Sequence, residues 1–136
     1  MEEATEPQVV FREDLPPEMM DAIQKEFGAD TEKAVVLRAE RFEHIKNGHS
    51  DIGGDMKQIL QSVIRRPDMM LKDTKYKDTI MLICQDSCRN INIVVKLSFS
   101  SEFENSIITA FRISNKSVKR FARKHKILTQ IEKDVL

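Results

Sequence analysis

The chain is poor in the residues that mark specialised protein classes: of 136 residues, four are glycine, four are proline and two are cysteine. So little glycine and proline excludes collagen-like and low-complexity chains. Two cysteines are too few for the disulfide framework of a small secreted domain, so we expect both to be reduced thiols. No apolar run approaches the roughly 18 residues that a membrane-spanning helix needs, and the acidic beginning of the chain does not resemble a secretion signal. We therefore expect a cytoplasmic protein without membrane contact.

Charged residues are plentiful, and their even balance of 22 basic and 22 acidic side chains conceals a gradient along the chain. Residues 1–33 contain ten acidic and three basic residues, a balance of −7, whereas residues 105–126 contain seven basic residues and no acidic one, a balance of +7. Clustered lysine and arginine neutralise phosphates, so the basic region indicates an anionic partner. The alternative is a solvated helix face whose charge the acidic region offsets in the fold.

Hydrophobic spacing predicts an α+β domain over residues 15–136, preceded by an acidic irregular segment over residues 1–14. We expect N-terminal helices, then a four-stranded antiparallel meander, because the runs of β-branched residues are joined by loops of hairpin length. A C-terminal helix follows. The predicted helices span 17–27, 39–46, 55–65 and 116–128, and the predicted strands span 69–72, 79–85, 91–99 and 106–113.

Two histidines near the end of the second predicted helix are the first candidates for chemistry. Imidazole titrates near neutral pH, so His44 and His49 could divide the roles of general base and general acid. The alternative is a pair of surface residues at a helix C-terminus.

The last predicted strand carries two further polar candidates. Side-chain alternation places Thr109 and Phe111 on one face of this strand and Arg112 on the other. Since only one face can cover the core, we expect either Thr109 or Arg112 at an edge or in a polar cleft. The alternative is an exposed arginine and a threonine that favours the strand.

A zinc site is a second hypothesis for the histidines. His44 and His49 are separated by four residues, and Cys84 and Cys88 by three, which are spacings that zinc ligands tolerate. Cys84 ends a strand and Cys88 lies in the following turn, so the two thiols need not point the same way. We therefore expect ordinary thiols and no metal or cofactor.

Three segments together resemble the barnase, Endo-U, colicin nuclease and RelE-like superfamily, in particular its branch from phages and mobile elements. They read Glu43-His44-Ile45-x-x-x-His49, Ile64-x-x-Pro67-Asp68 and Ile108-Thr109-Ala110-Phe111-Arg112. The resemblance covers about residues 38 to 126. It implies a small α+β domain in which helices precede a four-stranded antiparallel sheet, and the activity of a metal-independent ribonuclease that serves as a toxin or effector.

The resemblance also implies roles for individual residues. His44 and His49 would form the acid and base pair, Arg112 would bind the scissile phosphate, and Thr109 would orient it. RNA is the implied partner, with an immunity or antitoxin protein as a second one. The RNA-binding candidates follow the last strand: Ser114, Lys116, Lys119, Arg120, Arg123 and Lys124. A nucleic-acid-binding module without catalysis and a protein-interaction module remain the alternatives.

Overall fold

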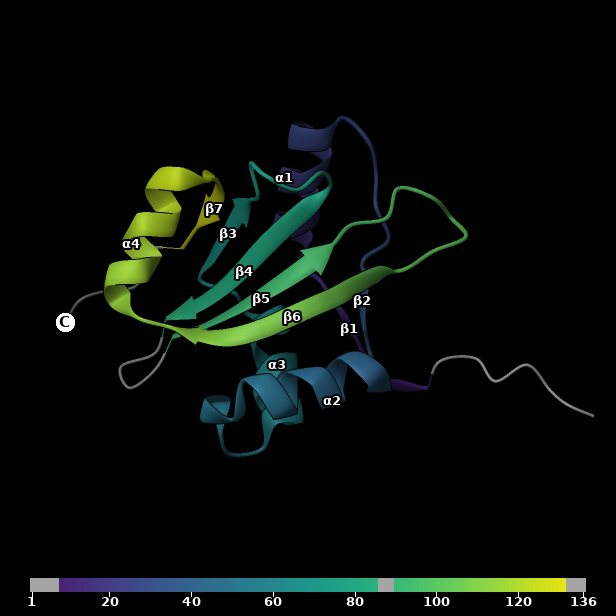
Figure 1. The fold of residues 1–136 in the computed structure, drawn as a ribbon. Coiled ribbons are helices and arrows are strands. Elements are labelled where there is room, and N and C mark those ends of the chain that lie inside the picture. Colours follow the sequence, from purple (N-terminus) through teal and green to yellow (C-terminus); the bar gives the residue numbers. More distant parts are fainter. Residues whose placement is uncertain (1–7, 86–89, 132–136) are drawn as a thin grey trace, which may run out of the picture.

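One seven-stranded sheet with helices packed on it makes up the computed structural model, which describes residues 8–85 and 90–131 (Figure 1). The strands lie in the order β1-β2-β6-β5-β4-β3-β7. Neighbouring strands are antiparallel except β2 and β6, so the sheet is mixed. The strands are β1 (Val9–Asp14), β2 (Ala34–Arg38), β3 (Met69–Lys72), β4 (Thr79–Gln85), β5 (Asn90–Lys96), β6 (Asn105–Ile113) and β7 (Lys126–Gln130). The helices are α1 (Pro17–Phe27), α2 (Ala39–Gly48), α3 (Met56–Arg65) and α4 (Asn115–Lys124), with a short 3-10 helix, η1 (Ser50–Ile52).

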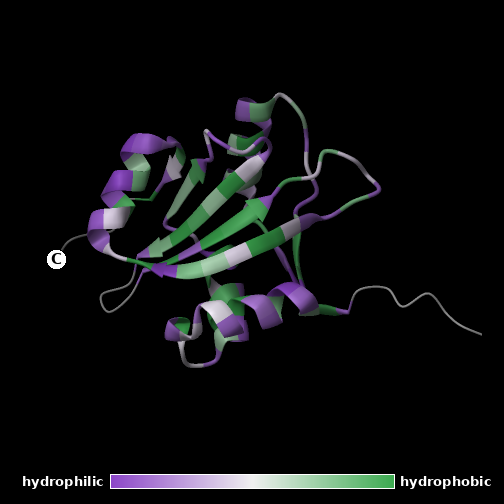
Figure 2. Ribbon diagram, in the orientation of Figure 1, coloured by the Kyte–Doolittle hydropathy of each residue, from purple (hydrophilic) through white to green (hydrophobic). Residues whose placement is uncertain are grey.

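The two faces of the sheet carry separate hydrophobic cores. The inner face packs with α1, α2 and α3, and its strands contribute buried side chains such as Leu82 and Ile93. The outer face packs with α4, where Val118 shares a smaller core with Met81 and Ile83. Hydrophobic residues are concentrated on the strands, and α4 lies over one end of the sheet only (Figures 1 and 2). Among the described residues, no helix therefore lies above the rest of the outer face.

Local signals explain why the predicted helices form where they do. Proline at the first position begins α1, and Gly28, with φ of 69°, ends it in the left-handed conformation that glycine adopts readily. The Asp55 side chain caps α3 by accepting a hydrogen bond of 3.2 Å from the Gln58 backbone N–H. The predicted helices over 17–27 and 55–65 are confirmed to within one residue, and β3 and β4 have the predicted bounds.

The predicted four-stranded antiparallel meander is wrong, because three further strands widen the sheet and one of the pairings is parallel. Two of the added strands, β1 and β2, come from the N-terminal region. The charged residues of β1 made residues 1–14 look irregular, yet Arg12 pairs with Glu104 across 2.7 Å and Phe11 is buried. Burial of Phe11 and backbone pairing with β2 thus keep this polar segment in the sheet as its edge strand, and the exposed ion pair adds to them.

The third added strand, β7, replaces the end of the helix predicted over 116–128. Helix α4 ends at Lys124, where the Thr74 hydroxyl donates a hydrogen bond to the Lys124 carbonyl. The Thr74 backbone N–H donates to Nδ1 of His125 across 3.1 Å. These contacts with the loop after β3 hold the end of the helix, and the following residues then pair with β3.

The link between β2 and β6 depends on one buried side chain at the start of β6. Asn105 is fully buried, and its Oδ1 accepts a hydrogen bond of 2.8 Å from the Ser98 backbone N–H. Its Nδ2 donates to the carbonyl of Glu32, and the Thr31 hydroxyl lies 2.7 Å from Oδ1. The side chain therefore joins the two segments that precede β2 and β6, where these strands run parallel.

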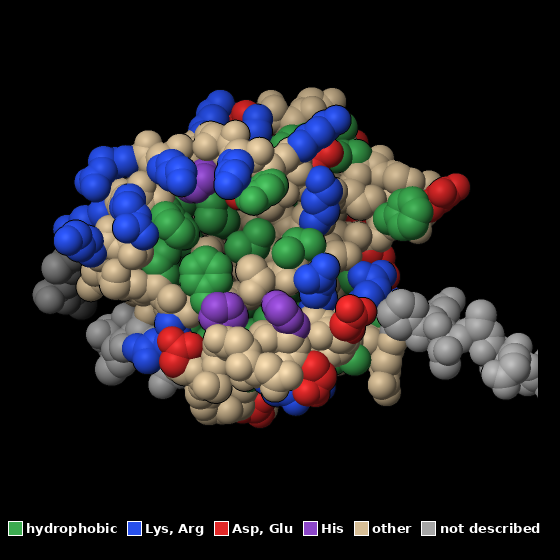
Figure 3. Space-filling view, in the orientation of Figure 1, with side chains coloured by type: hydrophobic (Ala, Val, Ile, Leu, Met, Phe, Trp, Pro, Cys, Tyr) green, Lys and Arg blue, Asp and Glu red, His purple; other side chains and the backbone are tan. Residues whose placement is uncertain are grey.

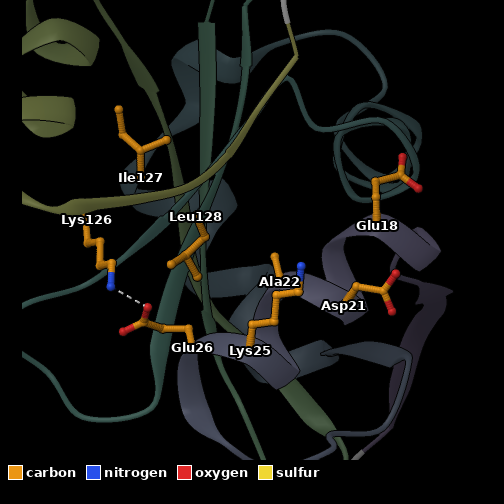
Figure 4. A pocket seen from close by; sticks show the side chains of 8 residues that line it. All are labelled: Glu18, Asp21, Ala22, Lys25, Glu26, Lys126, Ile127 and Leu128. Atoms are coloured by element: carbon orange, nitrogen blue, oxygen red, sulfur yellow. Dashed lines mark ion pairs between the residues drawn. The ribbon is translucent and has the colours of Figure 1, made fainter.

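Helix α1 is held against the other end of the sheet by a carboxylate with two cationic partners. Glu26 lies 2.6 Å from the Lys126 ammonium and 3.0 Å from that of Lys72. The pocket between α1 and β7 contains this ion pair (Figure 4). The hydrogen bond from Lys126 has the largest effect on the pKa of Glu26, and the one from Lys72 has the next largest. Both lower this pKa below its ordinary value of 4.5. The ionised form of Glu26 therefore stabilises the folded state.

We expect Glu26→Gln to reduce the pH dependence of stability on the acid side. A lowered carboxyl pKa contributes stability that is complete above the unfolded value of about 4.5 and is lost as pH falls through the folded value. Urea unfolding at a series of pH values measures this contribution. In the Glu26→Gln background, Lys126→Gln should have little further effect, and a large further loss would show that Lys126 acts through other contacts.

Candidate functional site

The C-terminal part of α2 places both candidate histidines beside β6. His44 is exposed on α2, and His49 is half-buried directly after it, where its backbone N–H donates a hydrogen bond of 2.7 Å to the Ile45 carbonyl. The buried Ile45 anchors this part of the helix in the inner core. Two histidine side chains border the hydrophobic patch of the sheet on the α2 side (Figure 3).

The edge of β6 that faces away from β5 is open where α2 lies. β2 pairs only with Asn105 and Ser106, so the described part of the chain provides no strand beside the rest of β6 on that side. Helices α2 and η1 contact β6 there. The His49 ring centroid lies 5.7 Å from that of Phe111, with the rings tilted by 42°. The imidazole is thus held at the border of the outer face by an aromatic contact.

A bulge in β6 brings an additional side chain to the outer face. Val94 pairs with Thr109 and Val95 with Ile107, so Ile108 is the extra residue on β6. Ile108 and Thr109 both line a cavity of about 520 Å³ on the outer face, together with Val94. Phe111 follows Thr109 by two residues and therefore lies on the same face. We call the surface that comprises His44, His49, Phe111, Thr109 and this cavity the outer-face site.

Arg112 does not belong to the outer-face site. It pairs with Ile91, whose side chain is part of the inner core, whereas Thr109 pairs with Val94 on the outer side. The alternation of the strand therefore places Arg112 and Thr109 on opposite faces, as the sequence predicts. The structure does not bring together the arginine and the threonine that the resemblance assigns to one phosphate.

The cations near Thr109 come from elsewhere in the chain. Lys96 of β5 and Lys77 of the loop before β4 both line the cavity. The Lys96 ammonium donates a hydrogen bond of 2.7 Å to the Lys77 carbonyl, which holds it at the cavity rim. Sequence reasoning missed both lysines, although Lys96 follows Val94 by two residues and so shares its face of the strand.

Helix α4 forms the opposite border of the hydrophobic patch. Val118 is buried against the sheet, and Ser114 caps the helix by accepting a hydrogen bond of 3.1 Å from the Ser117 backbone N–H. Ser114 thus has a structural role in addition to its predicted RNA contact. Lysine and arginine side chains gather over α4, across the patch from the histidines (Figure 3). The exposed ones are Lys116, Lys119, Arg120, Arg123 and Lys124.

The zinc hypothesis concerns residues that the structure describes only in part. Cys84 is half-buried and packs against the inner core, while Cys88 lies outside the described residues. Over residues 8–85 and 90–131, no group of three or more histidine, cysteine, aspartate or glutamate side chains is placed to hold a metal ion.

The described helices include none that is long and apolar enough to cross a membrane. Comparisons of this chain with models of known protein families, with curated proteins and with solved structures find no match.

Proposed function

We propose that the protein is an endoribonuclease that needs no metal ion and that its active site is the outer-face site. One observation carries the proposal: His49, directly after α2, contacts Phe111 on the same face of the sheet as Thr109. Two histidine side chains and several cationic side chains border the hydrophobic patch of that face (Figure 3). Two imidazoles beside a hydroxyl and ammonium groups supply the proton transfers and the charge that phosphodiester cleavage requires.

Cleavage would use the 2′-hydroxyl of RNA as the nucleophile. A neutral imidazole takes the 2′-hydroxyl proton while the oxygen attacks the adjacent phosphorus. A protonated imidazole gives its proton to the 5′-oxygen as the phosphorus–oxygen bond breaks. The products are a 2′,3′-cyclic phosphate and a free 5′-hydroxyl, and proton exchange with water restores both histidines. His44 and His49 share these two roles.

The remaining groups of the site would stabilise the phosphorane. The Thr109 hydroxyl can donate a hydrogen bond to a non-bridging oxygen, and the Lys96 ammonium adds positive charge near it. Because Arg112 lies on the other face, we assign the phosphate-binding role to Lys96 in its place. The basic residues of α4 would hold the rest of the RNA through its phosphates.

The resemblance to the barnase, Endo-U, colicin nuclease and RelE-like superfamily favours the same function, because it assigns catalytic roles to His44, His49 and Thr109, although it also assigns the phosphate to Arg112. As in members of that superfamily, the enzyme would act as a toxin or effector, and an immunity or antitoxin protein would be its second partner besides RNA.

Incubation of the purified protein with labelled RNA in excess EDTA tests the proposal. We expect cleavage that persists under chelation, fragments that end in a 2′,3′-cyclic phosphate, and no cleavage of RNA whose 2′-hydroxyls are methylated. Absence of cleavage, or cleavage that EDTA abolishes, would contradict the proposal.

The basic α4 favours a second candidate, a nucleic-acid-binding module without catalysis. Its exposed cations suffice for binding through phosphates, without any role for the histidines. Salt-sensitive RNA binding by the intact protein, with no cleavage under any condition, would identify this function.

A further inference from the structure

The cavity beside Thr109 has features that the cleavage reaction itself does not require. It lies between the loop that joins β3 to β4 and the bulge of β6, and it measures about 520 Å³. Val94 and Ile108 give it half-buried apolar walls, and Tyr76 lies at its rim. We propose that this cavity binds an unpaired nucleobase of the RNA, next to the phosphate that is cleaved. This inference rests on the proposed function, in that it takes the substrate to be RNA.

The exposed aromatic ring at the rim is the first argument. Tyr76 is 59% exposed, although a large aromatic side chain at the surface of a folded protein usually has a buried face. Unpaired bases bind proteins by stacking on such rings, because every base has a flat π-face. The apolar walls formed by Val94 and Ile108 would contact the edge of the base once it is removed from water.

Charge around the cavity is the second argument. The Lys75 ammonium lies 5.3 Å from the centre of the Tyr76 ring, and Lys77 and Lys96 line the cavity itself. The Asp73 carboxylate also lines the cavity, but the three lysines leave the local charge positive. A positively charged rim beside an apolar recess matches a nucleotide, in which a flat base is joined to an anionic phosphate. An apolar peptide segment would use the walls of the recess but would gain nothing from these cations.

The loop that carries Tyr76 is held in place by its own hydrogen bonds. The Asp73 carboxylate accepts hydrogen bonds from the backbone N–H groups of Lys75, at 2.7 Å, and Tyr76, at 3.1 Å. The Thr79 hydroxyl donates to the Lys77 carbonyl across 2.9 Å. A ring on a preorganised loop loses little conformational freedom on binding, which favours affinity.

The position of the cavity relates it to the cleaved bond. Thr109 lines the cavity, and Phe111, two residues further along the same face, contacts His49. A base in the cavity would therefore place its neighbouring phosphate over Thr109, within the outer-face site.

Intrinsic fluorescence gives a direct test, because Tyr76 is the only tyrosine in the chain and there is no tryptophan. The probe is a short RNA oligonucleotide with all 2′-hydroxyls methylated, which cannot be cleaved by 2′-attack. We expect it to quench the tyrosine emission on binding, after correction for absorption by the bases. Fluorescence anisotropy of the labelled oligonucleotide then gives the affinity of each variant.

We expect Tyr76→Ala to weaken binding of this probe by about 10-fold or more, and Tyr76→Phe to preserve the affinity. The matched control is Phe103→Ala, because Phe103 is another exposed aromatic, at 65%, in the loop before β6. An unchanged affinity in Tyr76→Ala, or an equal loss in Phe103→Ala, would overturn the base subsite.

The two proposals fail separately in this experiment. If the protein binds the probe in a Tyr76-dependent way but never cleaves unmodified RNA, the subsite stands and the nuclease proposal fails. If it cleaves RNA and Tyr76→Ala leaves both binding and cleavage unchanged, the subsite fails and the nuclease proposal stands. Since Tyr76 is exposed, the alanine variant should fold, and thermal unfolding by circular dichroism verifies this.

Discussion

Replacing either histidine of the outer-face site by alanine is expected to slow RNA cleavage by about 10²- to 10⁴-fold, the usual contribution of one general acid or base. The double variant His44→Ala/His49→Ala should lose little more than the more damaging single variant if the two imidazoles act in the same step. Single-turnover cleavage of a labelled RNA under chelation measures the effect. Affinity for the methylated probe should change much less than the rate, since most of the binding comes from phosphate contacts.

The third histidine of the chain is the matched control. His125 accepts a hydrogen bond from the backbone of Thr74 and stacks edge-on against Phe121, with ring centroids 5.8 Å apart. It helps to hold the end of α4, and its Nδ1 lies 3.8 Å from the Asp73 carboxylate, but it has no part in the proposed proton transfers. His125→Ala should therefore keep both limbs of the pH profile, and its cleavage rate should fall much less than that of His44→Ala. A rate loss in His125→Ala equal to that in His44→Ala, or full activity in both His44→Ala and His49→Ala, would contradict the assignment.

The pH profile adds a second measurement of the same prediction. One histidine must be neutral and the other protonated, so the rate should pass through a maximum and fall on both sides. Removing one histidine should abolish one limb of this curve. A profile that keeps both limbs in both variants would show that other groups transfer the protons.

The largest loss of stability from a single polar side chain is expected for Asn105→Ala, about 2 to 4 kcal/mol. The change leaves the Ser98 N–H and the Glu32 carbonyl without their buried partner. Both groups lie where β2 and β6 begin to pair, so the loss should loosen the N-terminal edge of the sheet. Urea unfolding should show a lower midpoint with an unchanged slope.

Asn47→Ala is the control for this measurement, because Asn47 is exposed near the end of α2. Its effect should stay within about 0.5 kcal/mol. Equal unfolding midpoints for Asn105→Ala and the unchanged protein would contradict the role assigned to the buried amide.

The candidate site could be predicted from the sequence only in part. Residue types and spacing identified His44, His49 and Thr109, because imidazoles and a strand hydroxyl are recognisable along the chain. Lys77, Lys96 and Tyr76 were missed, since each becomes part of the site only when the loop before β4 and the strand β5 meet the bulge of β6. The resemblance assigned Arg112 to the scissile phosphate, but the alternation of the strand, read from the sequence and found in the structure, places Arg112 and Thr109 on opposite faces.

The sequence by itself determined those elements whose signals are local. Proline before α1, glycine after it, the Asp55 cap and the short continuous apolar runs of β3 and β4 act within a few residues, so they specify helix and strand wherever the chain folds. Only the tertiary structure decided the width of the sheet. Burial of Phe11 and pairing with β2 hold the charged strand β1, and pairing with β3 holds β7. The long-range contacts Arg12–Glu104 and Thr74–Lys124 add to these. These partners are 92 and 50 residues apart along the chain, a distance at which no periodicity or capping pattern operates.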